Sequence, residues 1–122
     1  MTRTRKSLGQ RGEELAAEKL IELGYTLLAR NYRCAYGEID LIAQKGETLV
    51  FVEVRTRRGT AFGSPEESIT ARKQAHLIAA AQHYLQENLV SNENWRIDVV
   101  AVEMAKNGKL LRVEVLENAV TG

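Results

Sequence analysis

The chain has 122 residues, of which 44% are hydrophobic and 27% are charged, and its formal net charge is +1. This composition is typical of a globular protein, and we expect a single domain over residues 1–122. The sequence has no apolar run long enough to span a membrane, no secretory signal pattern at its start, and one cysteine, Cys34. A disulfide within the chain is therefore excluded, no Cys/His cluster indicates zinc, and a cytoplasmic location is expected.

The first predicted element is a helix that begins after Ser7 and ends before Gly24. Ser7 and Gln10 have the spacing of a capping box, and glycine is typical of the residue that follows a helix. Residues 1–6 are expected to be a flexible tail. Glu13 lies one turn before the apolar stripe of this helix, so we expect its carboxylate at the head of the buried face.

Three strands are predicted next. Residues 25–32 form the first apolar run, and the stretch GEIDLIAQKGETLVFVEVRTR over residues 37–57 contains two more, joined by a turn at Lys45-Gly46. From Arg57 the sequence RRGTAFGS is basic and contains glycine, and it is expected to form a mobile loop.

The two strands within residues 37–57 carry few charged side chains. Runs this apolar suit strands covered on both faces, where a charge is costly unless it is paired, hydrated or bound to a metal. Because side chains two apart on a strand share a face, Glu38 groups with Asp40, and Glu53 with Arg55. If the hairpin brings the two groups together, their carboxylates form an oxygen-rich site suited to Mg²⁺ or Mn²⁺.

A second helix is predicted from Ser64 to about Asn88. Ser64 as N-cap, Pro65 at the first helical position and Glu67 at the third form a strong start signal. Lys73 follows early in this helix, beside its apolar stripe.

Two strands complete the predicted fold. Residues 95–102 are one strand, Asn107-Gly108 is a hairpin turn, and residues 110–116 are the returning strand. Asp98 lies on the first of these strands and is expected to be structural. Residues 117–122 are expected to be a flexible tail. The order α-β-β-β-α-β-β indicates an α/β fold in which helices flank a mixed β-sheet.

The spacing of the acidic residues resembles that of a known group of enzymes. An acid in the first helix, an aspartate at the start of one strand and an E-x-K-like triplet on the next resemble the PD-(D/E)xK superfamily, which includes restriction endonucleases and archaeal Holliday-junction resolvases. Over residues 8–104 the chain more closely resembles the YraN family of small, endonuclease-like bacterial proteins. The positions that carry this similarity are Gly12, Glu13, Ala16, Gly24, Tyr25, Asn31, GEID at 37–40, FVEV at 51–54, Arg57, Phe62, Gly63, Lys73, Ala81, Tyr84, Leu85 and R-x-DVV at 96–100.

The resemblance implies a restriction-endonuclease-like fold and Mg²⁺- or Mn²⁺-dependent cleavage of DNA, in branched or damaged forms. It implies that Asp40 and Glu53 hold the metal, with Glu13 bound through water or to a second ion. The usual lysine of the triplet is Arg55 here, which stays protonated and cannot accept a proton. Lys73 is a candidate to supply an ammonium group from another direction.

Basic residues gather in two places. Residues 1–12 contain four of them, ending with Arg11, and no acid; the other group is Arg55, Arg57 and Arg58. Such patches on a nearly neutral protein allow a nucleic-acid partner. Next to a metal site, four side chains become candidate phosphate contacts. DNA is the expected partner, and association of two copies of the chain as a homodimer is a further option. These four are Arg57, Arg58, Lys73 and Arg11.

Other interpretations remain open on the sequence alone. Arg55 beside Asp40 and Glu53 could neutralise them as an ion-pair network without metal. Glu13 could be an ordinary first-turn acid favoured by the helix dipole. The protein could be a non-catalytic nucleic-acid-binding module in which Arg55 marks the loss of chemistry. A protein-interaction role through a sheet edge or the basic loop is a third alternative.

Overall fold

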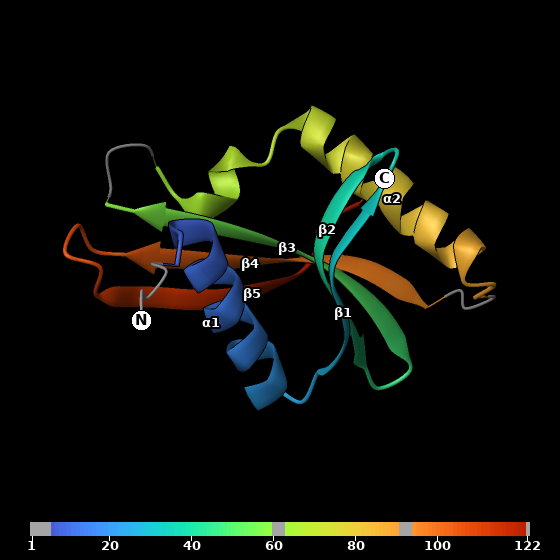
Figure 1. The fold of residues 1–122 in the computed structure, drawn as a ribbon, viewed down its shortest axis with the longest axis horizontal. Helices are drawn as coiled ribbons and strands as arrows, with labels where there is room; N and C mark the ends of the chain where they lie inside the picture. The colour runs from blue at the N-terminus through green and yellow to red at the C-terminus, as the bar shows by residue number, and fades with distance from the viewer. Residues whose placement is uncertain (1–5, 60–62, 91–93, 122) are drawn as a thin grey trace, which may run out of the picture.

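A computed structural model describes residues 6–59, 63–90 and 94–121. Its helices and strands follow the predicted order α-β-β-β-α-β-β, to which one short 3-10 helix is added (Figure 1). In chain order the elements are α1 (Leu8–Glu22), β1 (Thr26–Cys34), β2 (Gly37–Lys45), β3 (Thr48–Arg58), the 3-10 helix η1 (Pro65–Ser68), α2 (Ala71–Glu87), β4 (Trp95–Met104) and β5 (Leu110–Val120).

The five strands form one mixed sheet in the order β1-β2-β3-β4-β5. The pairs β1–β2, β2–β3 and β4–β5 are antiparallel, as short connections require. β3 and β4 are parallel, and the chain crosses between them through η1 and α2. The predicted α/β class with a mixed sheet is therefore confirmed.

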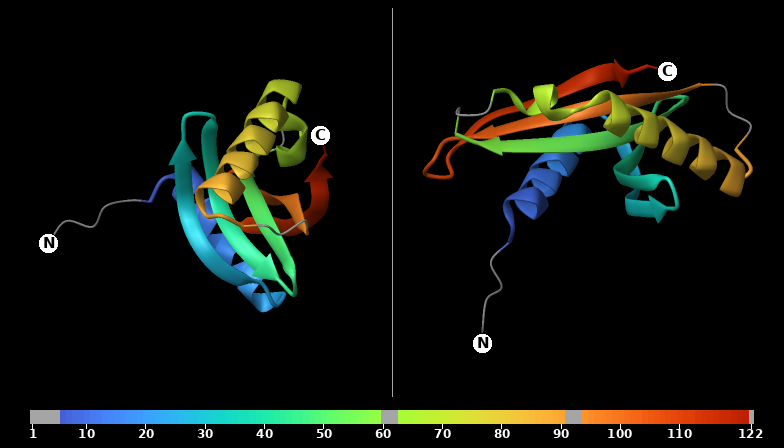
Figure 2. Two further views of the ribbon diagram at one scale, coloured as in Figure 1. Left: turned by 90° about the vertical axis from the view of Figure 1, so that its right-hand side faces the viewer. Right: turned by 90° about the horizontal axis from the view of Figure 1, so that it is seen from above.

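The two helices cover opposite faces of the sheet (Figure 2). The alternation of side chains along β3 produces this arrangement, because Val50 and Val52 pack beneath α1 whereas Leu49 and Phe51 pack beneath α2. From the helices, Ala16, Ala17 and Leu20 of α1 complete one core, and Leu77, Ala80 and Ala81 of α2 complete the other.

β2 and β3 separate at one end of their ladder. Their pairing runs from Leu41↔Val52 to Lys45↔Thr48, while the preceding part of β2 pairs with β1, as in Cys34↔Gly37. Figure 1 shows β1 and β2 curving away from β3. At the point of separation, Asp40 Oδ2 accepts a hydrogen bond of 2.8 Å from the backbone N–H of Val54. A side chain thus takes the place of a ladder bond, and the strands open a space beside Asp40.

The predicted start of the second helix is wrong. The side chain of Ser64 makes no capping hydrogen bond, residues Pro65–Ser68 form only η1, and the backbone is extended at Ile69. α2 begins after Thr70, whose side chain accepts a hydrogen bond from the backbone N–H of Lys73. The predicted helix is therefore two elements, and the second has its own N-cap.

The predicted C-terminal tail is also wrong, at least through Val120. β5 runs to Val120, which is buried and pairs with Ile97. Asn118 has φ 51°, and its backbone N–H donates to Asp98 Oδ1 at 2.9 Å, so a local irregularity returns the chain to the sheet. Residues 1–5 of the predicted N-terminal tail and residues 60–62 of the predicted loop lie outside the described residues.

Candidate metal and nucleic-acid site

A cleft of about 650 Å³ lies where β2 separates from β3, between α1 and α2. We call it the acidic cleft. Four carboxylates and three cations line it: Glu13, Glu38, Asp40, Glu53, Arg33, Arg55 and Lys73.

Gly12 sets the position of α1 over the cleft. A Cβ at this buried glycine would lie 1.9 Å from Thr56 Oγ1 and 3.0 Å from Thr56 Cβ, so the helix backbone approaches β3 more closely than a side chain permits. The capping box between Ser7 and Gln10 fixes the preceding turn. As a result the next residue, Glu13, lies over the strands and lines the acidic cleft.

Glu53 is the most deeply buried acid of the cleft, with 3% of its surface exposed. Its Oε2 lies 3.2 Å from Nζ of Lys73, which α2 brings over the sheet. The contact is an ion pair, and among the described residues this buried oxygen has no hydrogen-bond partner. Burial, and then the adjacent Asp40, raise the pKa of Glu53 to about 8, while Lys73 opposes the increase.

Glu13 belongs to the same electrostatic group. Burial raises its pKa, as do charge repulsion from Asp40 and Glu38 and a side-chain hydrogen bond with Asp40; Arg30 acts in the other direction. Asp40 is close enough to raise the pKa of both Glu13 and Glu53, and all three acids line the acidic cleft. The three acids predicted as metal ligands are therefore brought together from α1, β2 and β3.

Asn31 is a cleft residue that was not predicted to have a role. With its amide nitrogen turned toward the acids, it donates to Glu13 Oε1 at 3.0 Å and to Glu38 Oε1 at 3.1 Å. Its backbone has φ 53°, in the left-handed region that asparagine tolerates better than most residues. An asparagine inside a predicted strand was the available signal, but its partners are distant in sequence.

The cations are arranged differently from the expected ion-pair network. Arg55 lines the cleft, but its Nε donates to Ser68 Oγ at 2.8 Å. Among the described residues, Glu53 has an ion pair with Lys73, and neither it nor Asp40 has one with an arginine. The interpretation in which Arg55 neutralises Asp40 and Glu53 is therefore wrong for the described geometry. Lys73, and not Arg55, forms the ion pair with Glu53.

The four predicted phosphate contacts are not brought to one place. Lys73 lines the acidic cleft, whereas Arg11 and Arg58 line a separate hollow on the other side of the first turn of α1. Arg57 is half-buried near the end of β3, opposite Glu103 of β4. Of the four, Lys73 lines the acidic cleft, and the role of all four as phosphate contacts stays a prediction.

The acids have the oxygen donors that Mg²⁺ and Mn²⁺ prefer. Over residues 6–59, 63–90 and 94–121, no group of three or more His, Cys, Asp and Glu side chains has a ready-made metal-binding geometry. Glu53 Oε2 is nevertheless a buried oxygen with no hydrogen bond in the part of the chain that the structure describes, and its cleft contains three further carboxylates. The donor set therefore matches a divalent cation in the kind of its oxygens, and binding one would require the side chains to rotate within the cleft.

Asp98 forms a separate buried network. It has no exposed surface, and its Oδ1 accepts from Arg96 Nε and from the backbone N–H of Asn118, both at 2.9 Å. Its Oδ2 accepts from the hydroxyl of Tyr25 at 3.0 Å and from Arg96 at 3.3 Å. Burial and the adjacent Asp98 raise the pKa of Tyr25 to about 12. Four bonds satisfy this carboxylate, as a structural role requires.

These features define a three-layer α/β/α protein with a carboxylate-lined cleft at the divergence of two strands. Residues 12–102 match the uncharacterised protein family UPF0102, and the chain belongs to this family.

Relatives share nearly the whole chain. A UPF0102 protein of Caldicellulosiruptor saccharolyticus is 45% identical over 115 residues, which cover 94% of this chain and 98% of that protein. A UPF0102 protein of Roseiflexus castenholzii is 48% identical over 121 residues, covering 98% of each. No helix in the described part of the chain is long and apolar enough to cross a membrane.

Proposed function

We propose that the protein is a metal-dependent endonuclease that hydrolyses phosphodiester bonds in DNA. The observation that carries the proposal is the convergence of Glu13, Asp40 and Glu53, from three separate elements, on a cleft that also holds Lys73. Carboxylates that basic side chains do not fully neutralise repel a phosphate backbone unless a cation lies between them. The arrangement therefore suits a phosphate-processing site that uses a divalent cation better than a surface that binds DNA without one.

In this proposal Asp40 and Glu53 hold Mg²⁺ or Mn²⁺, and Glu13 binds through water or holds a second ion. When bound, the cation would polarise the scissile phosphate and lower the pKa of a water molecule. Lys73 stabilises the negative charge that develops on the phosphate. A guanidinium stays protonated and cannot take a proton from the attacking water, so Arg55 does not act as a base. Its role in this proposal is to orient the phosphate by forked hydrogen bonds.

The resemblance to PD-(D/E)xK enzymes supports the same proposal and extends it to branched or damaged DNA. A cytoplasmic location belongs to the proposal as well, since a reducing compartment keeps the free Cys34 reduced.

A non-catalytic nucleic-acid-binding module is the second candidate. The observation that favours it is the ion pair between Lys73 and Glu53, which offsets a cleft charge without a metal. The bond between Arg55 and Ser68, at the position where the triplet usually has lysine, points in the same direction.

Cleavage assays distinguish the two candidates. Duplex, single-stranded and four-way-junction DNA are incubated with the protein in Mg²⁺, Mn²⁺ or EDTA. We expect cleavage only with metal, and its loss in Asp40→Asn and Glu53→Gln but not in Glu22→Gln, a matched change at an exposed acid of α1. Salt-sensitive binding that the two cleft substitutions leave intact, without cleavage under any condition, would instead support the binding module.

A further inference from the structure

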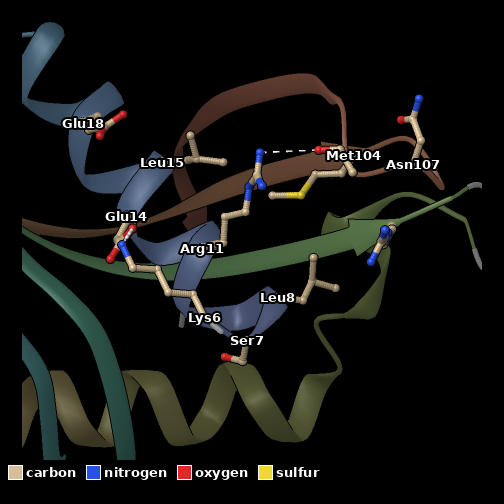
Figure 3. A pocket seen from close by; sticks show the side chains of 11 residues that line it. Lys6, Ser7, Leu8, Arg11, Glu14, Leu15, Glu18, Met104 and Asn107 are labelled. Carbon is tan, nitrogen blue, oxygen red and sulfur yellow. Dashed lines mark hydrogen bonds and ion pairs between the residues drawn. The ribbon is translucent and has the colours of Figure 1, made fainter. Parts of the chain in front are cut away.

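A second hollow, of about 800 Å³, lies beside the first turn of α1 (Figure 3). The end of β3 and the turn between β4 and β5 form its other walls. We call it the basic hollow, because Arg11 of α1 and Arg58 of β3 both line it. Ser7 and Leu8 line this hollow and the acidic cleft alike, so the two are neighbours on either side of the helix start.

The two arginines are held in place without being neutralised. Arg11 donates to the backbone carbonyl of Gly108 at 3.4 Å, and Arg58 Nε donates to that of Lys106 at 2.9 Å. Neither has an ion pair with a carboxylate in the described parts of the chain, and each guanidinium has further N–H groups to donate. Lys106 and Lys109 add positive charge in the same turn.

The acids of the basic hollow reduce this charge only in part. Glu14 lies 2.8 Å from Nζ of Lys6 and is thereby compensated, which leaves Glu18 at one side. Asn107, which also lines the hollow, accepts the backbone N–H of Lys109 with its Oδ1, so its amide nitrogen remains available as a neutral donor. Two fixed guanidinium groups and a neutral donor suit the oxygens of a phosphodiester backbone.

We propose that the basic hollow binds the DNA backbone away from the reacting phosphate, and so anchors the substrate of the acidic cleft. This inference rests on the proposed function. β3 gives the minimum separation, because it carries both Glu53 at the cleft and Arg58 at the hollow. Side chains alternate along a strand, so these two project from opposite faces of the sheet, and a bound backbone would pass over the start of α1, where Ser7 and Leu8 line both sites. Five residues of strand span about 17 Å. At 3.4 Å per nucleotide, this corresponds to a minimum of about five nucleotides of duplex DNA.

Binding measurements in EDTA test the anchor without requiring cleavage. Fluorescence anisotropy with a labelled 20-base-pair duplex is measured for wild type, Arg11→Gln and Arg58→Gln. The control is Lys19→Gln, which removes a charge from α1 at a groove beside β5. We expect about tenfold weaker binding for each arginine substitution. The slope of log K against log salt should also become shallower by about 0.9 for each lost phosphate contact, with no change in the control.

A length series with the wild-type protein gives a second test that no folding defect can affect. Some duplexes are too short to reach the basic hollow, because they extend fewer than about five nucleotides beyond the phosphate at the acidic cleft. Wild-type protein should bind these about as weakly as the arginine variants bind the long duplex. Equal affinity and salt slope for wild type and both variants, or affinity that does not depend on length, would overturn the anchor. The same inference falls if no duplex binds.

The anchor and the nuclease can fail separately. Arginine-dependent binding by a protein that never cleaves DNA supports the anchor and contradicts the nuclease. Metal-dependent cleavage with unchanged binding and KM in Arg11→Gln and Arg58→Gln supports the nuclease and overturns the anchor.

Discussion

At the scale of single residues, the cleft concentrates charge that the fold does not fully compensate. Glu53 is buried beside Asp40, and Lys73 is its one ion-pair partner among the described residues. A buried acid with a raised pKa reduces stability whenever it ionises in the folded state. Such stored electrostatic cost is common at functional sites, where a ligand of opposite charge relieves it.

The pKa of Glu53 predicts how stability depends on pH in metal-free protein. Its folded value of about 8 lies above the ordinary 4.5. The folded state therefore retains the proton more strongly, and this stabilisation is present below about pH 4.5 and is lost as pH rises to about 8. We expect Glu53→Gln to gain stability relative to wild type across this range, as measured by urea unfolding in EDTA between pH 5 and 9. A difference that does not change with pH would contradict the prediction, and Glu22→Gln serves as the control.

Lys73 and Arg55 are predicted to differ in importance. Lys73 contacts a proposed metal ligand, whereas Arg55 is bonded to Ser68. We expect Lys73→Ala to reduce the rate of DNA cleavage by about 100-fold or more, and Arg55→Ala to reduce it less. Arg72→Ala, a change at the exposed neighbour of Lys73 on α2, should leave the rate unchanged. Unchanged cleavage by Lys73→Ala would remove Lys73 from the chemistry.

The sequence predicts the acids of the cleft better than its other members. Alternation along two apolar strands places Asp40 and Glu53 in the site, and helical periodicity adds Glu13. The role of Asn31 depends on a left-handed backbone and on two partners far along the chain, which no local pattern encodes. Arg58 is close to Glu53 in sequence, but five residues of extended chain carry it to a different hollow.

At the scale of elements, tertiary contacts override a strong local signal between residues 64 and 70. The sequence there favours a helix start, yet Ser68 bonds Arg55 and the backbone carbonyl of Pro65. Arg112 of β5 binds Glu66 at 2.7 Å and lowers the pKa of that carboxyl group. These contacts hold η1 against the sheet, and the helix begins again at Thr70.

The close packing of α1 on β3 predicts an unusual effect of a small substitution. Alanine normally stabilises a helix relative to glycine by up to about 1 kcal/mol. At Gly12, however, the contact with Thr56 should make Gly12→Ala destabilising by about 1 to 3 kcal/mol. Gly9 lies in the same helix, and a Cβ added there would be 4.0 Å from its nearest neighbour, Ser7 Oγ. Gly9→Ala should therefore be neutral or stabilising. Urea unfolding measures both variants.

A double-mutant cycle identifies the cause of that effect. Thr56→Ala removes the two nearest side-chain atoms apart from Cβ, so it should restore part of the stability lost in Gly12→Ala. Additive effects of the two substitutions, or equal stability of Gly12→Ala and Gly9→Ala, would show that the contact does not limit the helix position.

At the scale of the whole molecule, the order of elements follows from the sequence, but the separation of β2 from β3 does not. Apolar runs, turn residues and caps predict seven elements in the right order. The separation depends on where a ladder of hydrogen bonds ends, and Asp40 replaces a ladder acceptor there. The end of β5 likewise depends on Asn118 and its distant partner Asp98.

Substitution of Asp98 should reduce the stability of the fold without affecting the acidic cleft. Removing this buried, fully bonded carboxylate leaves Arg96 with only the more distant carboxylate of Glu117, at 3.7 Å, and breaks the bond from Tyr25. Asp98→Ala should therefore lower the free energy of unfolding by about 3 to 5 kcal/mol. Urea unfolding measures this loss. At temperatures where the variant remains folded, it should still bind divalent cations like wild type. A loss below about 1 kcal/mol would contradict the structural role.

The central claim is that Glu13, Asp40 and Glu53 together bind a divalent cation, and calorimetric titration of metal-free protein with MnCl₂ tests it most directly. We expect saturable binding by wild type and by Glu22→Gln, weakened at least about tenfold in Asp40→Asn and in Glu53→Gln. Wild-type protein that does not bind Mn²⁺, or cleft variants that bind it as tightly as wild type, would contradict the claim.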